Sequence, residues 1–147
     1  MEHDKWMSLA LAEAQKAFDE GEVPIGAVVV ENGRIVGKGH NMTQALNDVT
    51  AHAEMIAITA AQTAVGKYLD RCTLYVTVEP CLMCAGAIGW SQLKTIVFGA
   101  EDPKKGYSTF TAPSRSPFHP KATVIRGVME RECGEILQRF FAMKRSL

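Results

Sequence analysis

Two short fragments of the sequence carry the residue types that metal-assisted hydrolysis requires. The first is His52-Ala53-Glu54, and the second is Pro80-Cys81-Leu82-Met83-Cys84. One imidazole and two thiolates are ligands that zinc prefers, and three protein ligands leave the fourth tetrahedral position open for water. Structural zinc sites are usually closed by four protein ligands. The set therefore predicts a catalytic site that holds one zinc ion per chain through His52, Cys81 and Cys84.

Glu54 is the residue that could move protons at such a site. Zinc lowers the pKa of a bound water to about 7, so that a nucleophile is available at neutral pH. A nearby carboxylate can take a proton from this water, deliver it to a ring nitrogen of the substrate and later pass one to the leaving group. We therefore predict that Glu54 is the catalytic proton carrier.

Both fragments are predicted to open helices. Cys81 and Cys84 are three residues apart, so on a helix they share one face, and Pro80 suits its first turn. His52 and Glu54 would point about 200° apart in the middle of a helix, but they can converge at its open N-terminal end. Because positive helix ends favour anionic ligands, the metal is expected where two helix N-termini meet.

The surrounding elements predict an α/β fold. Asn32-Gly33 is a strong two-residue hairpin turn, and Thr50 is a plausible helix cap. Alternating strands and helices indicate a three-layer α/β/α domain, formed by residues 1–147, around a mixed, mostly parallel five-stranded sheet. The predicted helices are 4–20, 50–64, 81–90 and 130–144, and the predicted strands are 24–30, 34–40, 72–78, 95–99 and 122–126.

Composition predicts a soluble cytoplasmic protein. The first ten residues lack a basic region followed by an apolar stretch, and no apolar run approaches the roughly 18 residues that a membrane span needs. Cysteines outside a secreted chain are expected to be reduced, and a close C-x-x-C pair then indicates a metal or redox site. Cys72 and Cys133 are predicted to be small buried apolar residues.

Charge is distributed unevenly, although the net charge is zero. Residues 1–93 carry six basic and eleven acidic side chains, a balance of −5, and residues 94–147 carry ten and five, a balance of +5. The basic segment could face a polyanion or could simply be a solvated surface. The long irregular stretch 101–121 lies within it, and its aromatic residues Tyr107, Phe110 and Phe118 could stack unpaired bases or fold back onto the core.

Together, the H-A-E and P-C-x-x-C fragments resemble the signature of the zinc nucleobase deaminases. A redox pair of the thioredoxin type would explain neither His52 nor Glu54. The resemblance extends over nearly the whole chain and is closest to the bacterial tRNA adenosine deaminases, which convert the anticodon wobble adenosine to inosine. The stretches that carry it are 22–28, 47–54, 74–81, 97–100, 102–106 and 140–145.

This resemblance implies a cytidine-deaminase-like fold, a homodimer and the anticodon stem-loop of a tRNA as the substrate. It also implies that Asn41 hydrogen-bonds the target purine or its ribose, the alternative being a turn residue after the second strand. Lys104, Lys105, Lys144 and Arg145 would contact phosphates. The substrate-binding residues implied in this way are Asn41, Ala53, Asp102, Lys104, Lys144 and Arg145.

The sequence departs from the family pattern at Gln92 and over Tyr107–Phe118, which bears on the substrate rather than on the reaction. Two alternatives therefore stay open. A free-base or nucleoside deaminase acting on guanine, cytosine or cytidine would share the catalytic residues, and the zero net charge suits it. A non-catalytic, zinc-stabilised binding module would leave Glu54 and the open metal position without a purpose.

Overall fold

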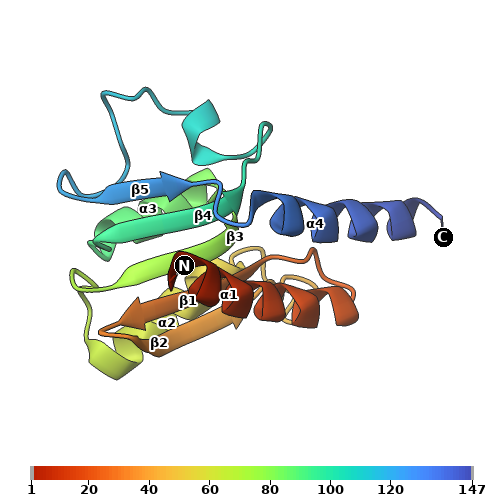
Figure 1. The fold of residues 1–147 in the computed structure, drawn as a ribbon, viewed down its shortest axis with the longest axis horizontal. Helices are drawn as coiled ribbons and strands as arrows, with labels where there is room; N and C mark the ends of the chain where they lie inside the picture. Colours follow the sequence, from red (N-terminus) through yellow and green to blue (C-terminus); the bar gives the residue numbers. More distant parts are fainter. Residues whose placement is uncertain (1, 147) are drawn as a thin grey trace.

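A five-stranded sheet forms the centre of the protein, in the order β2-β1-β3-β4-β5 (Figure 1). The computed structural model describes residues 2–146. The strands are β1 (Gly26–Glu31), β2 (Arg34–His40), β3 (Thr73–Val78), β4 (Thr95–Ala100) and β5 (Thr123–Arg126). The helices are α1 (Glu2–Asp19), α2 (Ala53–Val65), α3 (Leu82–Trp90) and α4 (Glu130–Arg145), with a 3₁₀ turn, η1, at Tyr107–Thr109.

The pairing of the strands confirms the mixed sheet. β1 pairs antiparallel with both of its neighbours, β2 and β3, whereas the β3–β4 and β4–β5 pairs are parallel. Consequently β2, β3, β4 and β5 all run in one direction, and β1 alone runs against them. The hairpin predicted at Asn32-Gly33 joins β1 to β2, and both of its residues have the positive φ angles that this turn requires.

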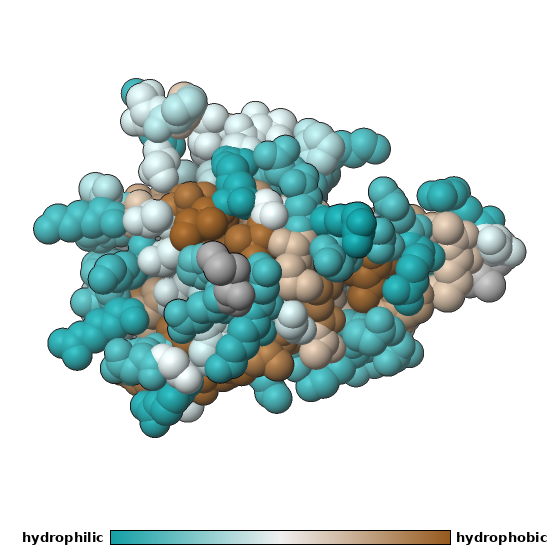
Figure 2. Space-filling view, viewed as in Figure 1, coloured by the Kyte–Doolittle hydropathy of each residue, from teal (hydrophilic) through white to brown (hydrophobic). Residues whose placement is uncertain are grey.

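Helices cover both faces of the sheet, as the three-layer prediction required. α1 and α4 lie on the near face in Figure 1, and α2 and α3 lie behind the sheet. Alternate residues of β1 point into these two cores: Val29 packs with residues of α2 and α3, and Val28 packs with residues of α1. Figure 2 looks onto the α1–α4 face, where hydrophilic side chains surround the apolar ones.

Helix α2 approaches β2 closely because two residues of the strand lack a side chain. A Cβ atom on Gly37 would overlap the carbonyl oxygen of Ala57, and one on Gly39 would lie 2.6 Å from the carbonyl oxygen of Ala53. Small residues on both elements therefore let the two backbones touch. Since Ala53 is the first residue of α2, this contact also positions the start of the helix against β2.

Two local predictions at the helix starts were wrong. α2 begins at Ala53, with His52 in the capping position, and the backbone N–H and hydroxyl of Thr50 instead donate to the carboxylate of Asp48. Pro80 precedes the capping residue of α3 and so lies outside its first turn. The short side chain of Asp48 accepts the backbone N–H of Thr50 and so forms a turn in the segment where we expected the helix to start.

The remaining cysteines behave as predicted. Cys72 and Cys133 are buried and free of disulfide bonds. Burial raises the pKa of the Cys72 thiol to about 11 and that of Cys133 to about 12, so both remain protonated at neutral pH. Between residues 2 and 146, none of the helices is long and apolar enough to cross a membrane.

Replacing Gly39 by alanine should lower the free energy of unfolding by about 2 kcal/mol, because the new Cβ would press on the Ala53 carbonyl and α2 would have to shift. Urea denaturation followed by circular dichroism measures this change. Gly134→Ala in α4 is the matched control: nothing lies within 4 Å of that position, so alanine should stabilise the helix by up to about 1 kcal/mol. Equal stability of Gly39→Ala and the unaltered protein would contradict the close packing.

Candidate active site

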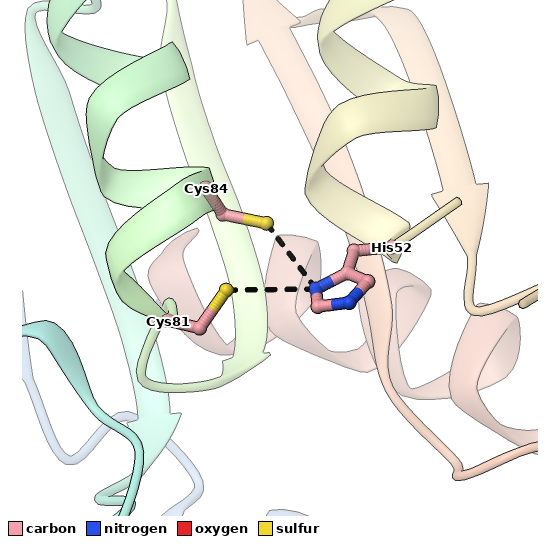
Figure 3. Close-up of side chains that lie close together, drawn as sticks. All are labelled: His52, Cys81 and Cys84. Carbon is pink, nitrogen blue, oxygen red and sulfur yellow. Dashed lines mark hydrogen bonds between the residues drawn. The ribbon is translucent and has the colours of Figure 1, made fainter. Parts of the chain in front are cut away.

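Three side chains from two helix starts converge on one point. The Nδ1 atom of His52 lies 3.6 Å from the Sγ atom of Cys81 and 3.5 Å from that of Cys84. All three ligand atoms lie within 4.8 Å of one another, and the side chains point toward each other (Figure 3). The structure thus brings together the three predicted ligands into a group that could hold a metal ion.

Both helices present their N-termini to this group. His52 caps α2 and Cys81 caps α3, each with extended backbone angles and without a side-chain capping hydrogen bond. Each side chain is therefore free to turn away from its helix and toward the site. The unpaired N–H groups at the two helix ends create a positive field that favours thiolates and a bound anion.

The two thiols differ in acidity. Hydrogen bonding from Cys84, and then from His52, lowers the pKa of Cys81 to about 4, despite an opposing effect of burial. Hydrogen bonding to Cys81, and then burial, raises the pKa of Cys84. The hydrogen bond to Cys81 also raises the pKa of His52. The sulfur of Cys81 is thus a thiolate at neutral pH, which is the form that binds metals.

Glu54 lies in the first turn of α2 and is buried. Burial is the main reason why its pKa rises to about 7, and the charge on Cys81 raises it further. Its carboxylate does not belong to the group of three possible ligands. A buried carboxyl that exchanges its proton near neutral pH, next to a three-ligand group, has the properties expected of a general acid–base.

Asn41 is buried at the end of β2, and its amide serves the protein's own backbone. The side-chain Nδ2 donates to the carbonyl of Val23 at 3.3 Å, and Oδ1 accepts from the N–H of Thr43 at 3.4 Å. These contacts fit the turn role that we considered. The amide has further donor and acceptor capacity, so the role toward a substrate stays a prediction.

The other predicted substrate contacts occupy different parts of the surface. Ala53 is buried beside His52 at the start of α2. Asp102 is half-buried, and its carboxylate accepts the backbone N–H groups of Lys104 and Lys105, whose side chains extend into solvent. Asp102, Lys104 and Lys105 lie in the segment that follows β4. They stay predictions, because their contacts within the chain do not define a ligand.

Lys144 and Arg145 are exposed in the last turn of α4, which projects beyond the sheet (Figure 1). The Nζ atom of Lys144 lies 5.4 Å from the centre of the Phe140 ring. A groove of about 570 Å³ separates this end of α4 from the loop after β2. The residues that line it are Glu20, Gly21, Glu22, Val23, Thr43, Gln44, Phe140 and Lys144.

The aromatic residues of the 101–121 loop divide between the two alternatives. Tyr107 and Phe118 are buried and pack edge to face, with ring centres 4.8 Å apart, whereas Phe110 is 56% exposed. Only Phe110 is therefore available to stack a base. Gln92 follows the C-terminus of α3, at the opposite end of this helix from Cys81, so the structure does not bring it to the site.

Sequence reasoning missed two buried carboxylates that hold loops near the site. Glu22 accepts the backbone N–H groups of Gln44 and Ala45, after β2. Glu79 accepts those of Asp102 and Ser108, after β4. Both glutamates belong to stretches that carried the family resemblance. A charged residue beside a buried strand was the only local signal that either had a specific role.

Comparison with known proteins identifies the family. The family model of the MafB19-like deaminases matches residues 1–145. The tRNA-specific adenosine deaminase of Bacillus subtilis (strain 168) is 47% identical, with 92% of this chain and 86% of the relative covered. That of Agrobacterium fabrum (strain C58) is 44% identical, with 98% and 97% covered. The chain belongs to the tRNA-specific adenosine deaminase family.

The fold of this deaminase matches a solved relative as well. A structure from a study of A-to-I editing by tRNA:A34 deaminases at the wobble position of transfer RNA is 43% identical and has a TM-score of 0.82. The match covers 90% of this chain and 99% of the other. The chain is therefore an enzyme of the nucleobase-deaminase class, and the predicted α/β fold is confirmed.

Proposed function

We propose that this enzyme uses zinc to deaminate adenosine to inosine at the anticodon wobble position of a tRNA. The observation that carries the proposal is the buried Glu54 carboxyl beside the converging His52, Cys81 and Cys84 side chains, in a chain 47% identical to a tRNA-specific adenosine deaminase. We further infer that residues 1–147 form a single catalytic domain, which acts in the cytoplasm.

The spacing of the three possible ligands supports zinc. Zinc bonds of about 2.3 Å to sulfur and about 2.0–2.1 Å to nitrogen, at a tetrahedral angle, place the nitrogen and sulfur atoms about 3.5–3.6 Å apart. The two Nδ1···Sγ distances are 3.6 and 3.5 Å. One nitrogen and two sulfurs are also a donor set that suits zinc. Zinc held by His52, Cys81 and Cys84 would supply the Lewis acid that makes water nucleophilic at neutral pH.

Glu54 would carry the protons of the reaction. Water adds to C6 of the adenine, and the overall change converts adenosine and water to inosine and ammonia. Glu54 would accept the first proton of the attacking water and deliver it to N1 of the ring. It would then take the second proton, from the hydroxyl now on C6, and pass it to the amino group, which leaves as ammonia while the C6 oxygen becomes the carbonyl of inosine. A pKa of about 7 lets one carboxyl act as acceptor and donor in turn.

A tRNA substrate is supported by the placement of basic side chains. Lys104 and Lys105 are exposed after β4, and Lys144 and Arg145 are exposed at the end of α4. All four would contact phosphates, whereas Asn41, Ala53 and Asp102 would lie against the target nucleotide. The wobble base is in a loop and already unpaired, so turning it into a pocket costs little free energy.

Homodimer formation is supported by an apolar strip on α3. Leu82 is 49% exposed, Met83 37% and Trp90 85%, and nothing lies within 4 Å of the Cβ position of Gly86 between them. Large exposed apolar side chains grouped on one helix face are typical of protein interfaces. We propose that this strip packs against a second copy of the chain.

The proton role of Glu54 is tested by comparing two variants. Glu54→Gln should retain about one zinc per chain but turn over roughly 10²–10⁴-fold more slowly, because the amide keeps the shape and cannot carry protons. Cys84→Ala should hold no metal and show no activity. Metal analysis by mass spectrometry and an ammonia assay give the two readouts. Full activity of Glu54→Gln would refute the proton role, and full zinc occupancy of Cys84→Ala would refute the ligand assignment.

The substrate is tested with total tRNA and with free guanine, cytosine, cytidine and adenosine. We expect inosine in the anticodon loop of tRNA and no turnover of the free compounds. The double change Lys144→Ala with Arg145→Ala should raise KM for tRNA and make its salt dependence shallower, by a slope of about 0.7 for each phosphate that the variant no longer binds. Efficient turnover of guanine or cytosine, with tRNA left unmodified, would instead assign the chain to the free-base deaminases.

The dimer is tested by light scattering coupled to size-exclusion chromatography. The unaltered protein should have the mass of two chains, and Trp90→Glu should have the mass of one, because a charge would be buried within an apolar contact. Leu9→Ser, an exposed position on the opposite face of the sheet, should leave the mass unchanged. A monomeric unaltered protein at micromolar concentration would contradict the proposal.

A further inference from the structure

Glu79 is a buried carboxylate whose hydrogen bonds all lead to one loop. It is 4% exposed. One carboxylate oxygen accepts the N–H of Asp102 at 3.2 Å, and the other accepts the N–H of Ser108 at 3.1 Å together with the Ser108 hydroxyl. Three donors satisfy the charge of a carboxylate that would otherwise be costly to bury. Glu79 therefore ties both ends of the segment 102–108 to the end of β3.

The same segment is joined to the metal-ligand loop by the backbone. The N–H of Tyr107 donates to the carbonyl of Pro80 at 2.9 Å, and Cys81 forms an isolated antiparallel bridge with Gly106. Pro80 and Cys81 follow Glu79 directly in the chain. The segment 102–108 is thus held by three consecutive residues, 79–81, the last of which is the predicted metal ligand Cys81.

The contact leaves no room for adjustment. A Cβ atom on Gly106 would overlap the Glu79 carboxylate and would lie 2.6 Å from the carbonyl oxygen of Asp102. The backbone of the segment therefore lies directly on the carboxylate. Any movement of Glu79 must be transmitted to the segment, because close-packed atoms cannot absorb it.

The segment in turn carries the basic side chains that would meet the substrate. The carboxylate of Asp102 accepts the backbone N–H groups of Lys104 and Lys105 at 3.1 and 3.0 Å, so their position follows that of Asp102. Asp102 itself is held by Glu79. The chain of contacts from Glu79 to the two lysines is continuous.

We propose that Glu79 is a positioning residue. Its carboxylate holds the segment 102–108 against the Pro80–Cys81 loop, a contact that we call the Glu79 clasp, and so fixes Lys104 and Lys105 relative to the reaction centre. This inference rests on the proposed tRNA substrate. Glu79 would act on affinity through the lysines, without touching the substrate or the metal.

A matched control is available on the other side of the site. Glu22 is equally buried and also accepts two backbone N–H groups and one hydroxyl, those of Gln44, Ala45 and Thr43. It holds the loop after β2, which contacts Asn41 through Thr43 but has no contact in the proposed chain from Glu79 to the lysines, so its effect on substrate binding should be independent of theirs. Glu22→Gln therefore reproduces the chemical change of Glu79→Gln at a different loop.

The clasp is tested first by amide hydrogen exchange on the full-length protein with zinc bound. Glu79→Gln replaces one acceptor oxygen with a donor, so exchange at Asp102 and Ser108 should accelerate about 10-fold or more. Glu22→Gln should accelerate exchange at Gln44 and Ala45 alone. If Glu79→Gln fails to fold, Ser108→Ala removes one of the three donors and should act in the same direction. Unchanged exchange in the segment would overturn the clasp.

The positioning role is tested by a double-mutant cycle on KM for tRNA. Glu79→Gln and the paired change Lys104→Ala with Lys105→Ala should each raise KM several-fold, by about 3- to 10-fold. Combined, they should raise it no more than the larger single effect, because displaced lysines no longer contribute. When Glu22→Gln is combined with the lysine changes, the factors by which the two changes raise KM should instead multiply. Zinc content should be equal in all variants, and Glu79→Gln should change kcat by less than about twofold.

The outcomes separate the two proposals. If the rises in KM caused by Glu79→Gln and by the lysine changes multiply, the positioning role is overturned, even when amide exchange is faster. The contact between Glu79 and the segment 102–108 would then be only structural. Failure of the unaltered enzyme to form inosine in tRNA would overturn the proposed function, and with it the role of the lysines. The exchange experiment would still decide whether Glu79 holds the segment.

Discussion

The direction of two strands determines where the site can form. β2 and β3 both run antiparallel to β1, which lies between them, so their carboxyl ends emerge at the same edge of the sheet. Each is followed by a helix on the same face, α2 after β2 and α3 after β3. The two helix N-termini therefore open toward one point, as at the strand ends of other α/β sheets. His52, Cys81 and Cys84 meet because of this arrangement.

Buried carboxylates help to hold the loops at that edge, in addition to the apolar packing of Tyr107 and Phe118. Glu22 and Glu79 each accept backbone N–H groups from a loop that follows a strand and forms no strand pairing at those positions. Charged acceptors form stronger hydrogen bonds than neutral ones, so few contacts are enough to fix each loop. Glu79 directly follows β3, and the backbone N–H of Glu22 donates to the carbonyl of Ala17 in α1, so regular elements position both glutamates and the glutamates in turn hold the loops.

The sequence predicted the convergence of the three possible metal ligands better than the contacts around them, for a physical reason. Such residues are recognised by type and close spacing, so the grouping of His52, Cys81 and Cys84 could be predicted locally. The role of Glu79 depends on donors 23 and 29 positions away, which no local pattern reveals. Likewise, the burial of Tyr107 and Phe118 and the exposure of Phe110 follow from how the loop closes. The strands and helices were predictable because their apolar periodicity is strong, but the exact starts of α2 and α3 depended on turn chemistry.

The contact between Tyr107 and Phe118 closes the intervening ten residues into a separate loop at the surface. Both anchors are buried and belong to the body of the domain, whereas Phe110 and most of the residues between them face solvent. Beyond Ser108, which the Glu79 carboxylate holds, such a loop can change in length and composition with little effect on His52, Cys81, Cys84 or the sheet. Evolution or engineering could thus replace this loop to suit a different nucleic-acid surface, while Glu54 and the three predicted metal ligands stay unaltered.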